Sequence, residues 1–339
     1  MSLQVEEQAS LLRYNTFGLP ASAQCLVHVH DDDEVRAALR LALLRELPLL
    51  VLGGGSNLLL TQDQQALVMH MQSRGRHIVD DDGEHCLVEA QAGENWHDFV
   101  QWTLQQGLVG LENLSLIPGT VGAAPMQNIG AYGVELADHF VSLDALHVAT
   151  GELHQFDLGA CRFAYRDSLF KQQAGQWVIL RVRMRLARHA PLRLDYGPLR
   201  GRLQVMGIEQ PNAQDVADAV CAIRREKLPD PRELGNAGSF FKNPLVSLTL
   251  AERIRQQHAD LVAYPAGVGQ VKLAAGWLIE RAGWKGYREG RVGVHEQQAL
   301  VLVNHGGASG SEVLALAEKI RADIRQRFAV ELEIEPNVR

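Results

Sequence analysis

Three glycine-rich segments carry residues whose types and spacing could bind a phosphate or present a reactive hydroxyl. They lie at residues 53–57, 116–133 and 235–244. Glycine allows a positive φ and a close approach of backbone to ligand, so successive N–H groups can hold a phosphate or diphosphate. Glycine accounts for 31 of the 339 residues, about 9% against a typical value of about 7%. The excess is small, so the concentration of glycine in these segments is the informative feature.

The first segment, Gly-Gly-Gly-Ser-Asn at 53–57, follows an apolar run at 49–52 that we expect to be a buried strand. It is not a Walker A loop, because no Lys-Ser or Lys-Thr pair follows it. It is not G-x-G-x-x-G either, because Leu58 stands where the last glycine would be. Two interpretations remain open: a phosphate-binding turn, and a tight hairpin between two buried strands.

The second segment is long, contains many small residues and has almost no charge. Small side chains leave backbone amides accessible to a diphosphate, and Gln127 and Asn128 can hydrogen-bond the edge of a heteroaromatic ring. An irregular segment crossing the core would instead leave its backbone polar groups unpaired. We therefore favour a ligand-binding loop.

The third segment places Ser239 between small residues and two phenylalanines, which suggests a hydroxyl presented from a tight turn. It is not the G-x-S-x-G elbow of hydrolases, because Phe241 follows Phe240 and no strand leads into it. The alternative, a serine that only supports a core turn, remains open.

Short strands and helices alternate around these segments, as in mixed α/β or α+β proteins. Acidic residues 31–34 begin a helix whose predicted inner stripe is Val35, Leu39 and Leu43. Residues 188–202 contain two prolines and two glycines, and we expect a loop that connects domains or forms a lid. The length of the chain predicts about two domains, joined between residues 185 and 230.

Composition excludes several classes of protein. The net charge of −7 and a pI near 6.0 argue against nucleic-acid binding by bulk electrostatics. No secretory signal or membrane-length apolar run is present, so we expect a cytoplasmic protein that does not bind membranes. The four cysteines are widely scattered and the 13 histidines show no ligand spacing, so we expect neither disulfides nor a metal.

Taken together, seven segments resemble the flavin-dependent UDP-N-acetylenolpyruvoylglucosamine reductases of bacterial peptidoglycan synthesis. The matching segments are residues 15–18, 53–57, 117–133, 165–168, 227–229, 238–244 and 274–279. They follow the family's order along nearly the whole chain. The resemblance implies a vanillyl-alcohol-oxidase-like (PCMH-type) FAD-binding region at 15–190, made of two subdomains split near 70–80. It also implies a C-terminal α+β domain at 200–339 that binds the UDP-sugar.

The resemblance assigns site residues in two groups. Those expected to bind non-covalent FAD are Gly53, Gly55, Ser56, Asn57, Pro118, Gly119, Thr120, Gly122, Ala123, Gln127, Asn128 and Gly130. Those expected to bind the substrate are Tyr132, Tyr165, Tyr196, Lys227, Asn243, Lys285 and Gln298. Tyr196 lies in a loop that only one subgroup of the family carries, where a tyrosine folds over the UDP diphosphate.

Three residues resemble the family's catalytic groups. Hydride addition to an enolpyruvyl ether makes a carbanion beside a carboxylate, and that charge needs stabilisation. Arg166 is similar to the guanidinium that does this, and Ser239 to the proton donor. Glu335 matches the acidic residue that assists the enol intermediate, with Glu333 as the less favoured alternative by register.

The implied activity is reduction of UDP-N-acetyl-3-O-(1-carboxyvinyl)-glucosamine to UDP-N-acetylmuramate by a monomeric enzyme. NADPH would reduce the flavin from the substrate site and then leave. Two alternatives remain. One is an oxidase of small alcohols from the same superfamily, and the other is a non-catalytic protein that binds a UDP-sugar or flavin.

Overall fold

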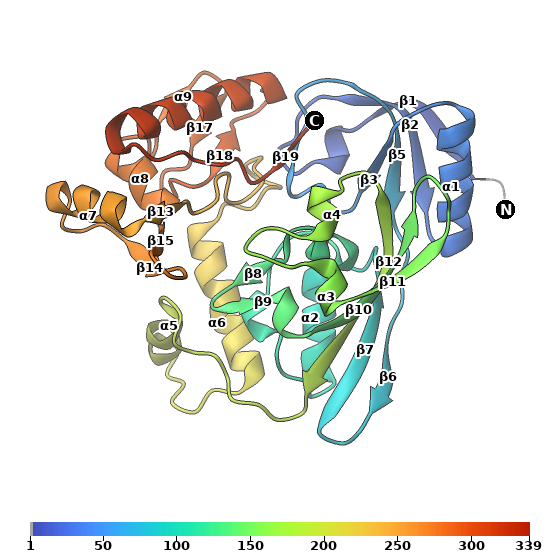
Figure 1. Cartoon of the computed structure of the whole chain (residues 1–339), viewed down its shortest axis with the longest axis horizontal. Helices are drawn as coiled ribbons and strands as arrows, with labels where there is room; N and C mark the ends of the chain where they lie inside the picture. The colour runs from blue at the N-terminus through green and yellow to red at the C-terminus, as the bar shows by residue number, and fades with distance from the viewer. Residues whose placement is uncertain (1–2) are drawn as a thin grey trace. The chain divides into compact units, whose positions relative to one another are not determined.

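The computed structural model describes residues 3–339, which form two compact units of mixed helix and strand (Figure 1). Unit 1 contains residues up to Ala9, Ala23–Gly54 and Gln65–Glu226. Unit 2 contains Ser10–Ser22, Gly55–Gln64 and Lys227–Arg339. The chain passes between the units within the first glycine segment, so Gly53 and Gly54 belong to unit 1 and residues 55–57 to unit 2.

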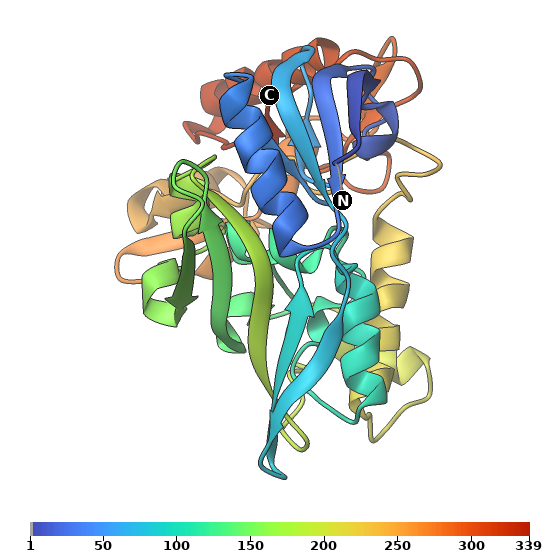
Figure 2. The same ribbon diagram turned by 90° about the vertical axis from the view of Figure 1, so that its right-hand side faces the viewer.

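Unit 1 begins with a four-stranded sheet of order β1-β2-β5-β3 and one helix against it (Figure 2). The elements are β1 Val5–Ser10, β2 Ser22–Val29, α1 Asp32–Leu44, β3 Leu49–Leu52 and β5 Gln64–Met71. The predicted helix is confirmed, and the Asp31 side chain caps it by accepting from the Glu34 N–H. The predicted stripe is wrong at Leu43, which is 76% exposed, because the 3.6-residue period puts Ala42 on the buried side.

A second sheet of unit 1 has five antiparallel strands in the order β11-β10-β12-β7-β6. The strands are β6 Arg76–Asp81, β7 His85–Gln91, β10 Phe140–His147, β11 Leu153–Asp157 and β12 Trp177–Ala187. Alternating apolar residues such as Val182 and Met184 face α2, Trp96–Gln105, whose Phe99 is fully buried. Figure 1 shows α2 on this face of the sheet.

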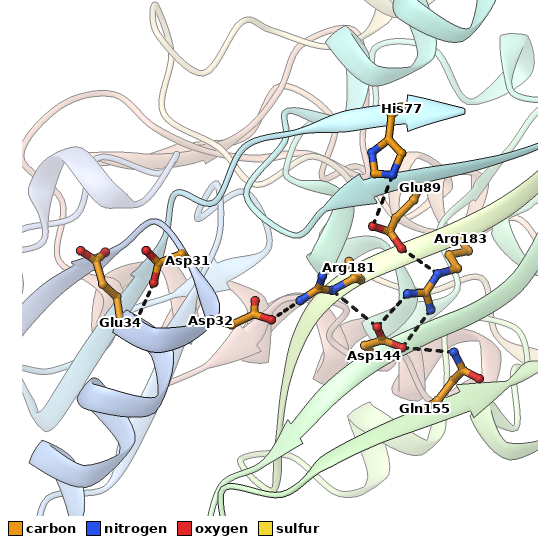
Figure 3. Close-up of polar contacts among 9 residues, drawn as sticks. All are labelled: Asp31, Asp32, Glu34, His77, Glu89, Asp144, Gln155, Arg181 and Arg183. Atoms are coloured by element: carbon orange, nitrogen blue, oxygen red, sulfur yellow. Dashed lines mark hydrogen bonds and ion pairs between the residues drawn. The ribbon is translucent and has the colours of Figure 1, made fainter. Parts of the chain in front are cut away.

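Charged residues on neighbouring strands pair across this sheet and reach α1 (Figure 3). Arg183 binds both carboxylate oxygens of Asp144 at 2.9 and 2.8 Å and reaches Glu89 at 2.7 Å. Arg181 pairs with Asp32 in the first turn of α1 and lies 3.5 Å from Asp144. Their side chains, other than that of Asp32, are less than a quarter exposed. This charge network therefore joins the N-terminus of α1 to three strands of the larger sheet.

The rest of unit 1 consists of short elements and two helices that pack on each other through Leu199, Leu203 and Val220. The elements are η2 Glu112–Leu114, η3 Val121–Gln127, β8 Gly130–Ala131, β9 Val134–Glu135, η4 Leu136–Asp138, α3 Leu158–Cys161, α4 Leu169–Gln172, α5 Leu199–Val205 and α6 Ala213–Lys227. The prediction of loop throughout residues 188–202 is wrong at its end, because α5 begins at Leu199. Pro198 stands just before that helix, where a missing N–H costs nothing. Figure 2 shows α6 alongside α2.

Unit 2 is built around a core of α8 and α9 with two three-stranded sheets. Its elements are η1 Leu12–Tyr14, β4 Leu58–Leu59, β13 Leu245–Ser247, α7 Leu248–Gln257, β14 Ala263–Pro265, β15 Gln270–Leu273, α8 Ala275–Arg281, β16 Arg288–Glu289, β17 Val292–Val294, β18 Leu302–Asn304, α9 Gly310–Phe328 and β19 Asn337–Val338. The capping box predicted at Ser309 and Glu312 is confirmed at the start of α9. No helix among residues 3–339 has the length and apolar character required to cross a bilayer.

Two histidines of the four-stranded sheet face each other across adjacent strands. The Nδ1 atoms of His28 on β2 and His70 on β5 are 3.0 Å apart. Burial lowers the pKa of His70 from 6.5 to about 4, with smaller contributions from the charges of His28, Arg74 and His30. The folded protein therefore keeps His70 neutral at pH values where the unfolded chain protonates it.

We expect the His70→Gln variant to lose less stability in acid than the wild type. Because the folded pKa lies below the unfolded one, the free energy of unfolding falls as pH decreases from 6.5 towards 4. With a discount for screening by solvent, His70 should account for a fall of about 1 kcal/mol in the free energy of unfolding between pH 6.5 and 5. Urea unfolding at several pH values measures it, with the exposed His189→Gln as control. Identical pH dependence in wild type and His70→Gln would contradict the assignment.

Candidate functional site

The first and second glycine segments meet within unit 1 at backbone distance. A Cβ added to Gly53 would lie 2.5 Å from Thr120 Oγ1, and one added to Gly54 would lie 3.0 Å from Gly119 Cα. A Cβ on Gly122 would clash with Ala92 at 2.4 Å. These contacts require glycine, so the peptide groups of Gly53 and Gly54 pack directly against Thr120 and Gly119. The junction therefore fits the predicted role of holding the phosphates of FAD.

The second segment turns at Asn128, which has a left-handed φ of 43°. Its amide nitrogen donates to Glu135 at 2.8 Å and to the Ala164 carbonyl at 3.3 Å, and its oxygen accepts from the Ala137 N–H. The observed bonds of Asn128 thus hold the loop itself. Binding of FAD by Asn128, like that predicted for Pro118, Ala123 and Gln127, stays a prediction.

Arg166 lies in a tight turn next to the end of this segment. The turn is closed by two backbone hydrogen bonds between Ala164 and Asp167, and Arg166 has a φ of 53°. Its Nη2 donates to the Gly130 carbonyl at 2.9 Å, and its guanidinium stacks 5.3 Å from the ring centroid of Tyr165. Gly130 is required here, because a Cβ would crowd Glu135 at 2.9 Å. The local backbone therefore fixes the predicted catalytic arginine.

Tyr132 and Tyr196 lie edge to face with ring centroids 6.5 Å apart. Asn113, fully buried, joins their loops by donating to the carbonyls of Tyr132 and Arg193 at 2.9 and 2.8 Å. Tyr196 itself is 44% exposed. The structure thus brings the predicted substrate residues Tyr132 and Tyr196 together on one side of unit 1.

Arg224 on α6 is a residue that the sequence analysis missed. Its Nε donates to the Leu116 carbonyl at 3.2 Å. Burial lowers the pKa of Arg224, the nearby Tyr132 and Cys221 oppose that shift, and the charge of Arg166 adds to it. Among residues 3–339, no carboxylate forms an ion pair with Arg224. The guanidinium groups of Arg224 and Arg166 therefore lie near each other, with no matching acid for Arg224, which suits an anionic ligand.

The sequence contains a signal for Arg224. The inner face of α6 includes Ala217, Val220 and Cys221, all buried. Position 224 follows Val220 by four residues and Cys221 by three, so it shares their face. An arginine at an apolar position of an amphipathic helix is uncommon and indicates a partner or a ligand.

In unit 2, Ser239 and Glu335 lie on adjacent extended segments. The Glu335 N–H donates to the Phe240 carbonyl at 2.9 Å, and Phe241 forms a β-bridge with Ile334. Ser239 is bridged on its other side to Val301. No hydrogen bond to Ser239 Oγ occurs among residues 3–339. The alternative Glu333 forms an ion pair with Lys242 instead. The structure therefore brings two predicted catalytic residues, far apart in sequence, close together.

The unit 2 part of the first glycine segment contacts the same C-terminal strand. Gly55 has a φ of 61°, and a Cβ there would lie 2.0 Å from the Tyr14 carbonyl oxygen. The Asn57 carbonyl accepts from the Asn337 N–H at 3.0 Å where β4 and β19 run parallel. Ser56 lies between these two fixed residues. Their contact with FAD stays a prediction.

The other predicted substrate residues are also in unit 2. Asn243 uses its oxygen to accept from the Ala275 N–H at 2.9 Å, which leaves its amide hydrogens for a ligand. Lys285 pairs with Glu280 at 2.9 Å, and Gln298 accepts weakly from Leu300. Lys227 is exposed at the end of α6. Within residues 3–339, no cluster of three or more His, Cys, Asp or Glu side chains could hold a metal.

Comparisons with known proteins match both parts of the chain. Residues 23–157 match the family model described as FAD binding domain. Residues 230–339 match the one described as UDP-N-acetylenolpyruvoylglucosamine reductase, C-terminal domain. The enzyme of that name from Pseudomonas aeruginosa is 65% identical over 338 residues, covering 100% of both chains. The one from Azoarcus sp. (strain BH72) is 54% identical and covers 98% of this chain and 97% of its own.

The fold also matches a solved structure. The crystal structure of UDP-N-acetylenolpyruvylglucosamine reductase from Thermus caldophilus has a TM-score of 0.68 at 24% identity, covering 100% of this chain and 99% of its own. The predicted fold class is confirmed, as is FAD as the cofactor. The chain belongs to the family of UDP-N-acetylenolpyruvoylglucosamine reductases.

Proposed function

We propose that the protein reduces the enolpyruvyl ether of UDP-N-acetylglucosamine to UDP-N-acetylmuramate with electrons from NADPH. The observation that carries this proposal is the placement of Ser239 beside Glu335 in unit 2. High identity to named reductases over the full chain supports the same substrate. That the enzyme is a cytoplasmic monomer stays a prediction.

Residues of both glycine segments would hold FAD, with Gly53, Gly119 and Thr120 at the phosphates. When bound, FAD would supply the hydride chemistry at one carbon of the substrate double bond, with NADPH as the source of electrons. The Ser239 hydroxyl gives its proton to the other carbon, which completes the reduction. Exclusion of water from a closed site makes a serine hydroxyl a competent donor to so basic a carbon.

Charged residues stabilise the intermediate between these two transfers. Hydride addition leaves negative charge that spreads from carbon to the adjacent carboxylate. Arg166, held by its bond to Gly130, offers a rigid and permanently charged donor to that carboxylate. Glu335 assists the enol form, and Arg224 adds a second positive charge near Tyr132 for an anionic group of the ligand. Lys227, Asn243 and Tyr196 would bind the diphosphate.

The purified FAD-loaded protein should consume NADPH only when UDP-N-acetylenolpyruvoylglucosamine is present. Absorbance of NADPH and analysis of the product by mass spectrometry measure the reaction. The expected product is heavier than the substrate by two hydrogen atoms, because a hydride and a proton are added. Absence of substrate-dependent NADPH loss would reject the proposed function. Oxygen consumption with simple alcohols would favour an oxidase instead.

Replacing Ser239 with Ala should separate the two half-reactions. Reduction of the flavin by NADPH does not need the hydroxyl and should stay within about threefold of the wild type. Oxidation of the reduced flavin by the enolpyruvyl substrate should slow by about 10²–10⁴-fold, the usual worth of a positioned proton donor. Stopped-flow absorbance of the flavin follows both steps, and Ser239→Cys should recover part of the rate. Equal losses in both half-reactions would make Ser239 structural.

Arg224→Met should raise the KM for the enolpyruvyl substrate by about 10–100-fold. The loss corresponds to one hydrogen bond between charged groups, about 1.5–3 kcal/mol. The matched control is Arg225→Met, the next residue of α6, whose side chain is exposed. That variant should change KM by less than about twofold. Similar effects of the two substitutions would show that Arg224 acts only through the net charge of the helix.

A further inference from the structure

Leu116, in the second glycine segment, connects α2 with α6 through its own backbone. Its N–H donates to His97 Nδ1 at 3.1 Å, and its carbonyl accepts from Arg224 Nε at 3.2 Å. Leu116 has a φ of 58°. A left-handed non-glycine residue costs about 1–3 kcal/mol and persists only where its surroundings hold it. Both backbone polar groups of Leu116 are held by side chains.

The bond to Leu116 fixes the protonation state of His97. A ring nitrogen that accepts a hydrogen bond carries no proton, so neutral His97 has its hydrogen on Nε2. Protonation of His97 would place a hydrogen on Nδ1, facing the Leu116 N–H, and would break the bond. His97 also lines a cleft of about 250 Å³ between α2 and α6. His97 can therefore gain a second proton only by giving up its hydrogen bond with Leu116.

The charges around His97 favour the neutral ring. Burial is the largest cause that lowers the pKa of His97, and Arg225 and Arg224 on α6 lower it further. Asp98 on α2 opposes them. The same cleft is lined by Asp218 and Cys221 of α6 and by Gln101 of α2. Burial and the two arginines together outweigh the effect of Asp98 on the pKa of His97. The ring therefore stays neutral at neutral pH and accepts a hydrogen bond from the Leu116 N–H.

We propose that His97 is a positioning residue which, by holding Leu116 in the left-handed conformation, aims Arg224 at the anionic group of the substrate. This inference rests on the proposed function, because it takes Arg224 as a binding residue for that substrate. Loss of the His97 bond releases the Leu116 peptide, so the carbonyl no longer fixes Arg224 Nε. Arg224 keeps its charge but loses its orientation. KM therefore rises while kcat changes little.

Three substitutions at His97 separate this role from simple packing. Asn places an oxygen where Nδ1 lies and keeps the acceptor without titrating. Gln places its polar group one bond further out, and Leu has no acceptor. We expect His97→Leu and His97→Gln to raise KM about 5–20-fold with kcat within about threefold, and His97→Asn to stay within about twofold of the wild type. Gln101→Leu, on the same helix and cleft, is the control and should leave KM unchanged.

The pH dependence gives a second readout. In the wild type, KM should rise as pH falls from 7.5 towards 5, because the lowered pKa of His97 is approached and the acceptor is lost. Gln101→Leu, which keeps His97, should show the same rise in KM as the wild type. His97→Asn should lack the part of the rise that comes from protonation of His97. Equal KM values for the Leu, Gln and Asn variants, or an unchanged acid limb in His97→Asn, would overturn the proposal.

Hydrogen exchange of the Leu116 amide in the ¹⁵N-labelled holoenzyme tests the structural step without turnover. Protection should fall at least tenfold in His97→Leu and return in His97→Asn. If the wild type fails to reduce the enolpyruvyl substrate, the proposed function is rejected while this protection still reports on the bond. Protection of the Leu116 amide could depend on a hydrogen-bond acceptor at position 97 while KM does not. In that case His97 holds the loop without positioning Arg224, and the inference fails.

Discussion

Unit 1 depends on a steric constraint: two segments from distant parts of the chain pack so closely that neither Gly53 nor Gly54 has room for a side chain. A Cβ on Gly53 or Gly54 would overlap or crowd Thr120 and Gly119. Hydrogen bonds from Trp96 N–H to the Gly119 carbonyl and from Val121 N–H to the Glu94 carbonyl hold the second segment in place. A junction this close tolerates little displacement, so the elements that deliver each segment must be fixed against one another.

The charge network of Figure 3 supplies part of that fixation. β3, which delivers Gly53, follows α1 in the chain, and Asp32 in the first turn of α1 is bound by Arg181 of the larger sheet. Burial raises the pKa of Asp144, but the hydrogen bonds and charge of Arg183 and the charge of Arg181 outweigh it, and the pKa is lowered. Asp144 stays ionised and its partners stay paired. A half-buried network with every charge matched specifies orientation more than it adds stability.

Local features of the sequence predicted local structure. Acidic residues 31–34 predicted the start of α1, and Ser309 with Glu312 predicted the capping box of α9, because caps depend on neighbours in sequence. The exposure of Leu43 follows from the exact helical phase, which a stripe of three residues does not fix. The start of α5 was hidden because prolines and glycines in 188–202 are equally compatible with a loop.

The candidate site shows the same difference between features that the sequence predicts and contacts that only the folded chain reveals. Resemblance to a family located Ser239 and Glu335, but their adjacency results from β-bridges between segments separated by most of unit 2. No local pattern encodes such a pairing. The ligand role predicted for Asn128 rests on its residue type and on the family resemblance, and the structure shows its amide engaged by Glu135, Ala164 and Ala137. Side-chain chemistry limits what a residue can bind, and only tertiary contacts show what already occupies it.

The role of Arg224 can be understood from the net charge of the whole chain. A protein of net charge −7 has no bulk attraction for anionic ligands, so local cations must bind them. Placing a guanidinium on the inner face of α6 near Arg166 costs free energy in the absence of an anion, through burial and repulsion between like charges. An anionic ligand relieves both costs when it binds. The cost of burying Arg224 therefore favours the liganded state, and the hydrogen bond that Arg224 donates to the Leu116 carbonyl determines the direction in which its guanidinium points.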